Sequence, residues 1–309
     1  MDAVAFNSTT NIDWVTATVA FEFTLAATDA GKFLFLLWLI ISIELPLRGL
    51  PCTFRHVFTV TNSLLLCLYF SMMSFFIASA ISHSHHDDIL FQHRAMKAVS
   101  ITFGLTELSY LWFNFIRSSE VLKLYSTPKV YKVFQRILYL TPICSTTSFF
   151  LEFIPVDPID SYKIYVFAAI IPAMLTLALD SFFTYSYLFH LFFSTSMNIT
   201  AQPECKIIAR YGLISTSLCF FGFCFFVLQS ITFFQPVSDD GIIRLFYVSN
   251  ALFDLGMWGA ETTVFFMKIA LVRPGMLQVN GGKQSVKNLA KGFLDGSDNL
   301  NTIAREVEK

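Results

Sequence analysis

A long apolar stretch near the C-terminus, Ile242–Val272, limits what this chain can fold into. It holds about thirty residues, and a helix of about 20 apolar residues already crosses a bilayer. Polar and charged residues recur in it at steps of four, seven and seven: Asn250, Asp254, Glu261 and Lys268. A step of seven misses two full helical turns by only about 20°, so these side chains share one stripe of the helix. Because a carboxylate facing hydrocarbon costs several kcal/mol, the stripe predicts a bundle of membrane helices with a polar interior.

The composition agrees with a membrane protein. Hydrophobic residues make up 55% of the 309 residues and charged residues only 14%, which is unusual for a soluble domain. The net charge of -1 argues against nucleic acid as a partner. We therefore expect an all-α membrane protein, a seven-transmembrane helix bundle in contact with the lipid bilayer. Its seven spans are predicted at Ala26–Leu47, Val57–Ile81, Ala98–Ile116, Ile137–Ile154, Ile164–Phe193, Tyr211–Phe234 and Ile242–Val272.

The distribution of Lys and Arg predicts the orientation of this bundle. With the N-terminus outside, the inner loops carry ten basic residues, and the outer loops with the rim of the first helix carry five. Cytoplasmic loops are enriched in Lys and Arg, so we expect the N-terminus outside. Residues 1–25 are then an extracellular or luminal segment with a glycosylation sequon at Asn7, and residues 26–273 are the transmembrane domain. Residues 274–309 are a cytoplasmic tail, in which apolar spacing predicts an amphipathic helix at about 285–294.

Four carboxylates lie well inside the predicted spans, away from their ends: Glu107, Asp180, Asp254 and Glu261. Apart from Lys32 and Arg244, which we expect at the outer ends of their spans, the one basic residue inside a predicted span is Lys268, near the inner end of the last helix. These acids cannot all be ion-paired, so some are protonated, hydrogen-bonded to polar neighbours or neutralised by a bound cation. Two interpretations stay open: a site for a proton, a sodium ion or a cationic ligand, and a structural polar network between the third and seventh helices.

The other charged or metal-binding patterns have structural interpretations. Asp29 with Lys32 and Glu44 with Arg48 are spaced as ion pairs at the two ends of the first predicted helix. The run His83–Asp88 stands alone, without the separated histidine clusters of a di-iron site, so we expect an outer loop there. No nucleophile–base pair or metal-ligand set falls inside the bundle. We therefore expect no enzyme, no cofactor and no metal site.

The topology resembles that of the G-protein-coupled receptor superfamily. The resemblance rests on seven predicted spans with an outer N-terminus, a basic second inner loop, Pro172 in the fifth span and a basic amphipathic tail. It lies in topology and not in motifs, because the third span ends as Phe115-Ile116-Arg117-Ser118-Ser119-Glu120 and the seventh lacks Asn-Pro-x-x-Tyr. It implies a divergent, chemoreceptor-like membrane receptor that transmits a signal to a cytosolic protein.

On this interpretation a small ligand enters from the outer side, and a polar network deeper in the bundle acts as a switch. The ligand-binding residues are expected to be Glu107, Asn250, Asp254 and Trp258. The switch network is expected to be Asp180, Glu261 and Lys268. The basic inner surface that contacts the cytosolic signalling protein is expected to be Arg117, Lys123, Lys129, Lys132, Arg136 and Arg210.

Two other functions stay open. One is a proton- or cation-coupled transporter that uses the four intramembrane carboxylates as a relay, although the two halves of the sequence show no internal repeat. The other is a non-catalytic membrane scaffold or accessory protein. The plasma membrane is the expected location, with an endomembrane as the alternative.

Overall fold

The computed structural model describes residues 8–85, 89–125, 127–151, 158–196, 203–233 and 240–279, and these residues are helical almost throughout. The described part of the chain forms seven long helices: α1 (Ser8–Leu39), α4 (Val60–Ser84), α5 (Ile89–Tyr125), α6 (Pro128–Leu151), α7 (Pro158–Ser196), α8 (Pro203–Phe233) and α9 (Asp240–Val279). A π-helical turn, η1 (Ile40–Glu44), and a short helix, α2 (Leu45–Leu47), continue α1. A single turn, α3 (Phe54–Val57), precedes α4.

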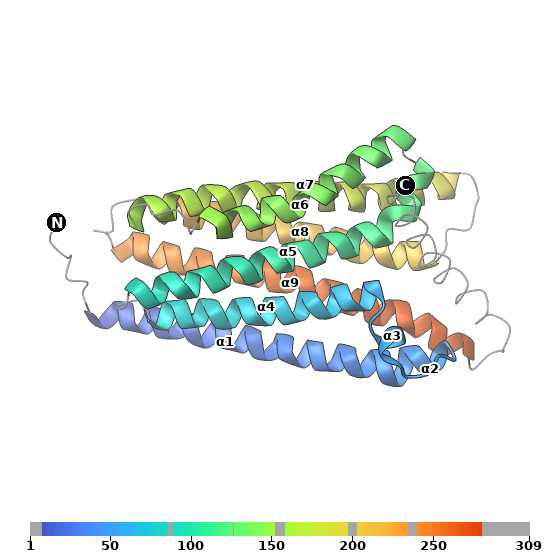
Figure 1. Cartoon of the computed structure of the whole chain (residues 1–309), viewed down its shortest axis with the longest axis horizontal. Coiled ribbons are helices and arrows are strands. Elements are labelled where there is room, and N and C mark those ends of the chain that lie inside the picture. The colour runs from blue at the N-terminus through green and yellow to red at the C-terminus, as the bar shows by residue number, and fades with distance from the viewer. Residues whose placement is uncertain are drawn as a thin grey trace.

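The long helices lie side by side along the longest axis of the molecule, and consecutive helices run in opposite directions (Figure 1). We call the end where α1, α5, α7 and α9 begin the first end, and the end where α4, α6 and α8 begin the second end. The first helix packs against α4 and α9, α5 packs against α4, α6 and α7, and α8 packs against α7 and α9. The first and last long helices are therefore parallel neighbours.

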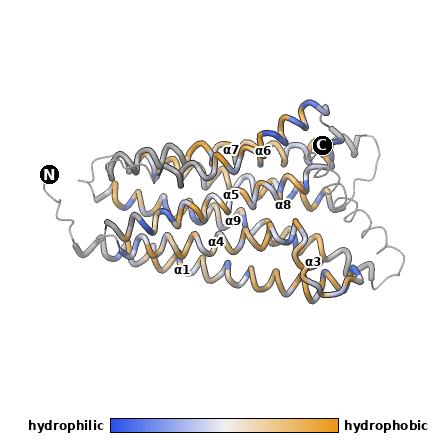
Figure 2. The backbone as a smooth tube through the Cα atoms, in the orientation of Figure 1, coloured by the Kyte–Doolittle hydropathy of each residue, from blue (hydrophilic) through white to orange (hydrophobic). Residues whose placement is uncertain are grey.

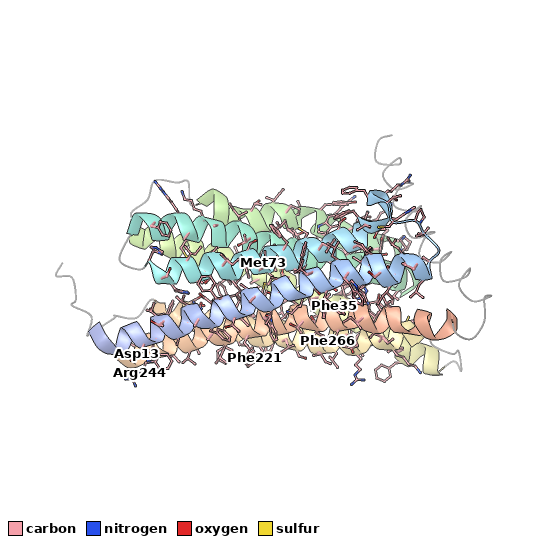
Figure 3. All side chains as sticks on the ribbon, turned by 90° about the horizontal axis from the view of Figure 1, so that it is seen from below. Asp13, Phe35, Met73, Phe221, Arg244 and Phe266 are labelled. Carbon is pink, nitrogen blue, oxygen red and sulfur yellow. The ribbon has the colours of Figure 1, made fainter. Side chains whose placement is uncertain are left out.

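The outer surface is apolar, as lipid contact requires. Leu34 is 63% exposed, Phe192 75% and Phe266 52%, and apolar residues run along all the long helices (Figure 2). In Figure 3 the labelled side chains Phe35, Phe221 and Phe266 lie along one long face, whereas Asp13 and Arg244 lie at the first end. A soluble monomer does not expose so much contiguous apolar surface.

Five helical segments of the described residues are long and apolar enough to cross a membrane: Asp13–Leu47, Val60–Ser84, Ala169–Phe192, Cys205–Thr232 and Gly241–Val272. By length and composition these segments make the chain a multi-pass membrane protein. The prediction of an all-helical membrane protein is confirmed at this level.

The helix ends differ from the expected ones. The first helix begins at Ser8 and not at Ala26, because the preceding turns are rich in Ala, Val and Phe and their one buried acid, Glu22, has polar partners within the bundle. The last helix continues past Pro274 to Val279, since a proline removes a single backbone N–H and neighbouring turns can carry the helix through it. The expected sequon at Asn7 and the expected amphipathic helix at 285–294 lie outside the described residues.

Candidate functional site

The polar stripe of α9 faces the interior of the bundle, as its spacing predicts. Asn250, Asp254, Glu261 and Lys268 are 7%, 1%, 2% and 9% exposed. Their partners come mainly from α1 and its continuation η1, which carry four buried charged residues: Glu22, Asp29 and Lys32 in α1, and Glu44 in η1. The interface between the first and last helices therefore holds three polar clusters, spaced along the length of the bundle.

The outer cluster lies nearest the first end and joins four helices: Glu22 of α1, Ser79 and His83 of α4, Gln229 of α8, and Asn250 and Asp254 of α9. The Glu22 carboxylate accepts a hydrogen bond from the Ser79 hydroxyl at 2.8 Å and lies 3.0 Å from Nδ1 of His83. The Asn250 amide donates to Asp254 at 3.1 Å and to Glu22 at 3.4 Å, and the Gln229 amide donates to Asn250 at 2.8 Å. His83, expected in an outer loop, is thus in the last turn of α4 and contacts a buried acid.

The middle cluster is built around Lys32. Its ammonium nitrogen lies 2.7 Å from Asp29 Oδ1 and 2.7 Å from the Thr262 hydroxyl. It also lies 3.5 Å from Glu261 Oε2 and 4.4 Å from the centre of the Trp258 ring. The expectation that Asp29 and Lys32 form a pair is confirmed, but its place is wrong. Because α1 starts earlier than expected, the pair lies in the middle of the first candidate span and is buried, 0% and 8% exposed.

The third cluster, near the second end, joins Glu44 to two cations. Lys268 lies 2.7 Å from Glu44 Oε2 and donates a hydrogen bond to the Asn62 amide oxygen at 3.1 Å. Arg48 lies 2.6 Å from the other carboxylate oxygen, Glu44 Oε1. The predicted pair of Glu44 and Arg48 is confirmed, and Lys268 of α9 is a third member that the sequence did not predict. The acid therefore ties the end of the first span to the last helix.

The π-helical turn explains why Glu44 faces α9. In a regular α-helix the twelve steps from Lys32 to Glu44 amount to about 1200°, which is about 120° beyond three full turns. The one extra residue of a π-turn removes about 100° of this rotation, so the two side chains differ by only about 20°. The turn at Ile40–Glu44 thus places Glu44 on the same side of the helix as Lys32.

The other two predicted intramembrane acids have neutral partners on helices other than α1 and α9. Asp180 of α7 accepts hydrogen bonds from Asn114 at 2.9 Å and from Thr216 at 2.6 Å. The hydroxyl groups of Ser145 and Thr176 donate to Glu107 of α5. Both acids are buried, at 2% and 3% exposure. Their partners lie on α5, α6, α7 and α8, so these contacts do not link Glu107 to the polar stripe of α9.

A cavity of about 50 Å³ lies between α4, α5, α7, α8 and α9. Glu107 and Glu261 are its two acidic lining residues, and most of the others are apolar or aromatic, including Phe103, Phe226 and Phe253. A volume of this size has room for water molecules. Within the described residues, no group of three or more His, Cys, Asp or Glu side chains is arranged to hold a metal ion.

The four residues expected to bind a ligand do not converge on one point. Asn250 and Asp254 lie together in the outer cluster, whereas Trp258 stacks on Lys32 and its indole N–H donates to Thr28 at 2.9 Å. Glu107 lines the cavity with Glu261. The cavity therefore brings together Glu107, which was expected to bind the ligand, and Glu261, which was expected to belong to the switch network.

The six basic residues expected to contact a cytosolic protein fall into two groups. Five are exposed: Lys123, Lys129, Lys132, Arg136 and Arg210. The sixth, Arg117, turns into the bundle, where one guanidinium nitrogen donates to Met267 Sδ at 2.7 Å and the group stacks on Phe113. Its backbone carbonyl accepts a hydrogen bond from the Tyr187 hydroxyl. Arg117 thus contacts neighbouring helices from within the bundle, whereas the exposed Lys123 lies over the Tyr131 ring of α6.

The fold and its buried charges define a multi-pass α-helical membrane protein with a polar interior and an apolar surface. Comparison with known proteins narrows this class no further. No family model matches the chain, and none of the curated proteins compared with it is significantly similar.

Proposed function

We propose that the chain is a divergent seven-transmembrane receptor whose N-terminus lies outside. Two of the seven long helices, α5 and α6, are less apolar than the five candidate spans. However, α5 has neighbours on several sides, so its polar residues can face protein and not lipid. Both helices also expose apolar side chains, such as Ile101 and Leu105 on α5 and Leu140 and Ile143 on α6. These features support seven crossings.

The charge asymmetry between the two ends supports the orientation. Exposed Lys and Arg residues of α5, α6 and α8 gather at the second end, and hydrophilic residues mark the first turns of α6 (Figure 2). Basic residues are enriched on the cytoplasmic side of membrane proteins, so the second end is the cytoplasmic one. The outer cluster with Asp254 then lies toward the outside, where a ligand would arrive.

The observation that carries the proposal is the cavity shared by five helices. A small ligand in it would contact α4, α5, α7, α8 and α9 together. If these helices pack differently in two conformations, the ligand shifts the equilibrium by its difference in affinity for the two. Glu107 is the acidic ligand contact on α5, and Glu261 is the link to α9. The exposed basic residues of α5, α6 and α8 are the surface that meets the cytosolic partner.

A nucleotide-exchange assay with charge-reversal variants tests the proposal. The protein is reconstituted in nanodiscs, and GDP release from a panel of purified heterotrimeric G proteins is measured with and without it. We expect one G-protein class to release GDP faster, and the acceleration to be lost when Lys123, Lys132 and Arg136 are replaced by Glu. Reversal of Arg94 and Arg244, which are exposed near the first end, is the matched control and leaves the acceleration unchanged. No acceleration with any class, or equal loss in the control, contradicts the proposal.

A proton- or cation-coupled transporter is a second candidate, because charged clusters follow the α1–α9 interface from Glu22 to Glu44. Such a row of ionisable groups across a membrane protein is typical of proton relays. The test is uptake into proteoliposomes of a panel of radiolabelled cations and organic solutes, driven by an imposed pH gradient. Gradient-dependent uptake that is lost in Asp254→Asn would favour the transporter over the receptor. Equal uptake with and without the protein would remove this candidate.

A further inference from the structure

Three buried oxygen atoms in the middle cluster accept no hydrogen bond within the described part of the chain: Asp29 Oδ2 and both Glu261 carboxyl oxygens. Both side chains are almost fully buried, at 0% and 2% exposure. A buried carboxylate oxygen without a donor is expensive, and such groups in folded proteins are nearly always satisfied. The two orphaned carboxyl groups therefore need an explanation.

The charges of the cluster do not balance if both acids are ionised. Lys32 is the one cation of the described residues in contact with them, and its two short contacts go to Asp29 and Thr262, each at 2.7 Å. Its distance to Glu261 is 3.5 Å, too long for an equal share of the same ammonium group. Lys32 therefore neutralises Asp29, and an ionised Glu261 would be a buried, uncompensated charge.

The carboxyl groups of Asp29 and Glu261 lie within hydrogen-bonding reach of each other across the α1–α9 interface. Two ionised carboxylates at such a distance repel, whereas one shared proton turns the contact into a short, strong hydrogen bond. We propose that the middle cluster is a proton-binding site, in which Glu261 carries the proton and donates it to Asp29 Oδ2. The cluster is then Asp29 anion, Lys32 cation and neutral Glu261, with no net charge.

Apart from Lys32, the groups around Glu261 in the described part of the chain offer no cation. The facing ionisable groups are Asp29 and Lys32 from α1, Tyr69 from α4, Glu107 and Tyr110 from α5, and Cys219 from α8. The cavity residues of α7, Ala173, Thr176 and Leu177, do not titrate. On α9 itself the nearest cation of the stripe is Lys268, which lies seven residues away and contacts Glu44. With Lys32 held by Asp29, a proton is the positive charge that neutralises Glu261.

The cavity gives this proton a way to exchange. Glu261 is one of its lining residues, so a water molecule there can accept the proton and become hydronium, which leaves a Glu261 anion. The anion would then compete with Asp29 for Lys32 and change the contact between α1 and α9. The inference concerns the resting charge of this interface and does not depend on whether the protein is a receptor or a transporter.

Infrared spectroscopy of the protein in nanodiscs tests the proposal, because the C=O stretch of a protonated carboxyl is separate from carboxylate bands. At neutral pH we expect such a band, shifted in deuterium oxide, which is lost in Glu261→Gln. Glu107→Gln is the matched control, because it removes another buried acid that lines the same cavity. In this control we expect the part of the protonated-carboxyl band that comes from Glu261 to remain. A spectrum in which Glu261→Gln changes no protonated-carboxyl intensity would overturn the proposal.

A second variant tests the charge balance without altering Glu261. In the Asp29→Asn variant Lys32 loses its anion, so we expect Glu261 to give up its proton and to pair with Lys32. The protonated-carboxyl band of Glu261 is then lost although Glu261 is present. Persistence of the Glu261 band in Asp29→Asn would contradict the proposed balance.

Thermal unfolding gives an independent readout. Each single variant keeps one anion for Lys32, so we expect a midpoint within about 4 °C of the wild type. The double variant Asp29→Asn with Glu261→Gln leaves Lys32 buried without an anion, and we expect the midpoint to fall on the order of 10 °C. Additive effects of the two substitutions would mean that the carboxyl groups do not replace each other, and the proposal would be wrong.

Discussion

At the scale of single residues, the buried charges differ in how many partners they have. Glu44 contacts two cations, Lys268 at 2.7 Å and Arg48 at 2.6 Å, and can lose either one while keeping the other. Lys268 has one anion and the neutral Asn62 amide. The cost of a substitution in this cluster should therefore depend on which charge is left without a counter-ion, and less on how many contacts are removed.

We predict that Glu44→Gln destabilises the protein more than Lys268→Met. Removing the acid leaves Lys268 as an uncompensated buried cation, a loss of about 3–5 kcal/mol, whereas removing the lysine leaves Glu44 paired with Arg48. The Arg48 side chain is 30% exposed, so Arg48→Gln should lower the free energy of unfolding by less than about 1 kcal/mol. Unfolding of the three variants in the same detergent gives the order, and a larger loss for Arg48→Gln than for Glu44→Gln would contradict this account.

At the scale of helices, two local features position the charged residues. The π-helical turn at Ile40–Glu44 sets the direction of Glu44. The helices α8 and α9 meet at glycines: a Cβ atom on Gly256 would lie 2.7 Å from the Gly222 Cα atom. These two glycines therefore let the backbones of α8 and α9 approach closely.

Deletion of Ile41 should act through Glu44. Ile41 is 37% exposed, so little packing is lost with it. The deletion restores a regular α-helix and turns Glu44 away from α9 by about 100°. We expect a loss of stability similar to that of Glu44→Gln, and little further loss when the two changes are combined. Fully additive losses in a double-mutant cycle would show that the turn does not act by aiming Glu44.

Gly256→Ala should force α8 and α9 apart, because the added methyl group meets backbone atoms that cannot move alone. We expect a loss of about 1–3 kcal/mol. Gly31→Ala is the matched control: Gly31 also lies within a long helix, and its added Cβ would meet nothing within 4 Å. The control should be neutral or slightly stabilising, since Ala favours helix over Gly. Equal effects of the two substitutions in thermal unfolding would contradict the close contact.

At the scale of the whole molecule, the number of crossings decides where the turn between α5 and α6 lies. If all seven long helices cross the membrane, this turn lies on the cytoplasmic side. If only the five most apolar segments cross it, the turn lies outside together with α5 and α6. We predict that Thr127→Cys, exposed at this turn, resists a membrane-impermeant maleimide until the cells are permeabilised. The background lacks the six native cysteines. Arg94→Cys, near the first end, is the control and should react in intact cells. Labelling of both in intact cells would contradict seven crossings.

The sequence predicted the polar side of α9 but not its partners. A step of seven residues in a helix reveals which side chains share a face, and all four stripe residues are buried as expected. Asn250 and Glu22 are separated by 228 residues along the chain, and periodicity within one helix carries no information on such contacts. The contribution of α1 to the polar interior was not predicted either, because Asp29 and Lys32 were assigned to the outer end of a shorter span that begins at Ala26. The π-turn that aims Glu44 has no recognisable sequence pattern.

The parallel pairing of α1 with α9 also bears on how the protein is made. The ribosome releases α1 first and α9 last, so Asp29, Lys32 and Glu44 enter the bilayer long before Thr262 and Lys268 exist to meet them. Until then these side chains need water, headgroups or a membrane chaperone to shelter them. A nascent chain that stops short of α9 has the Asp29–Lys32 and Glu44–Arg48 pairs of its first span but lacks their contacts with the last helix. Synthesis of α9 is thus the step that encloses these charged pairs between two helices.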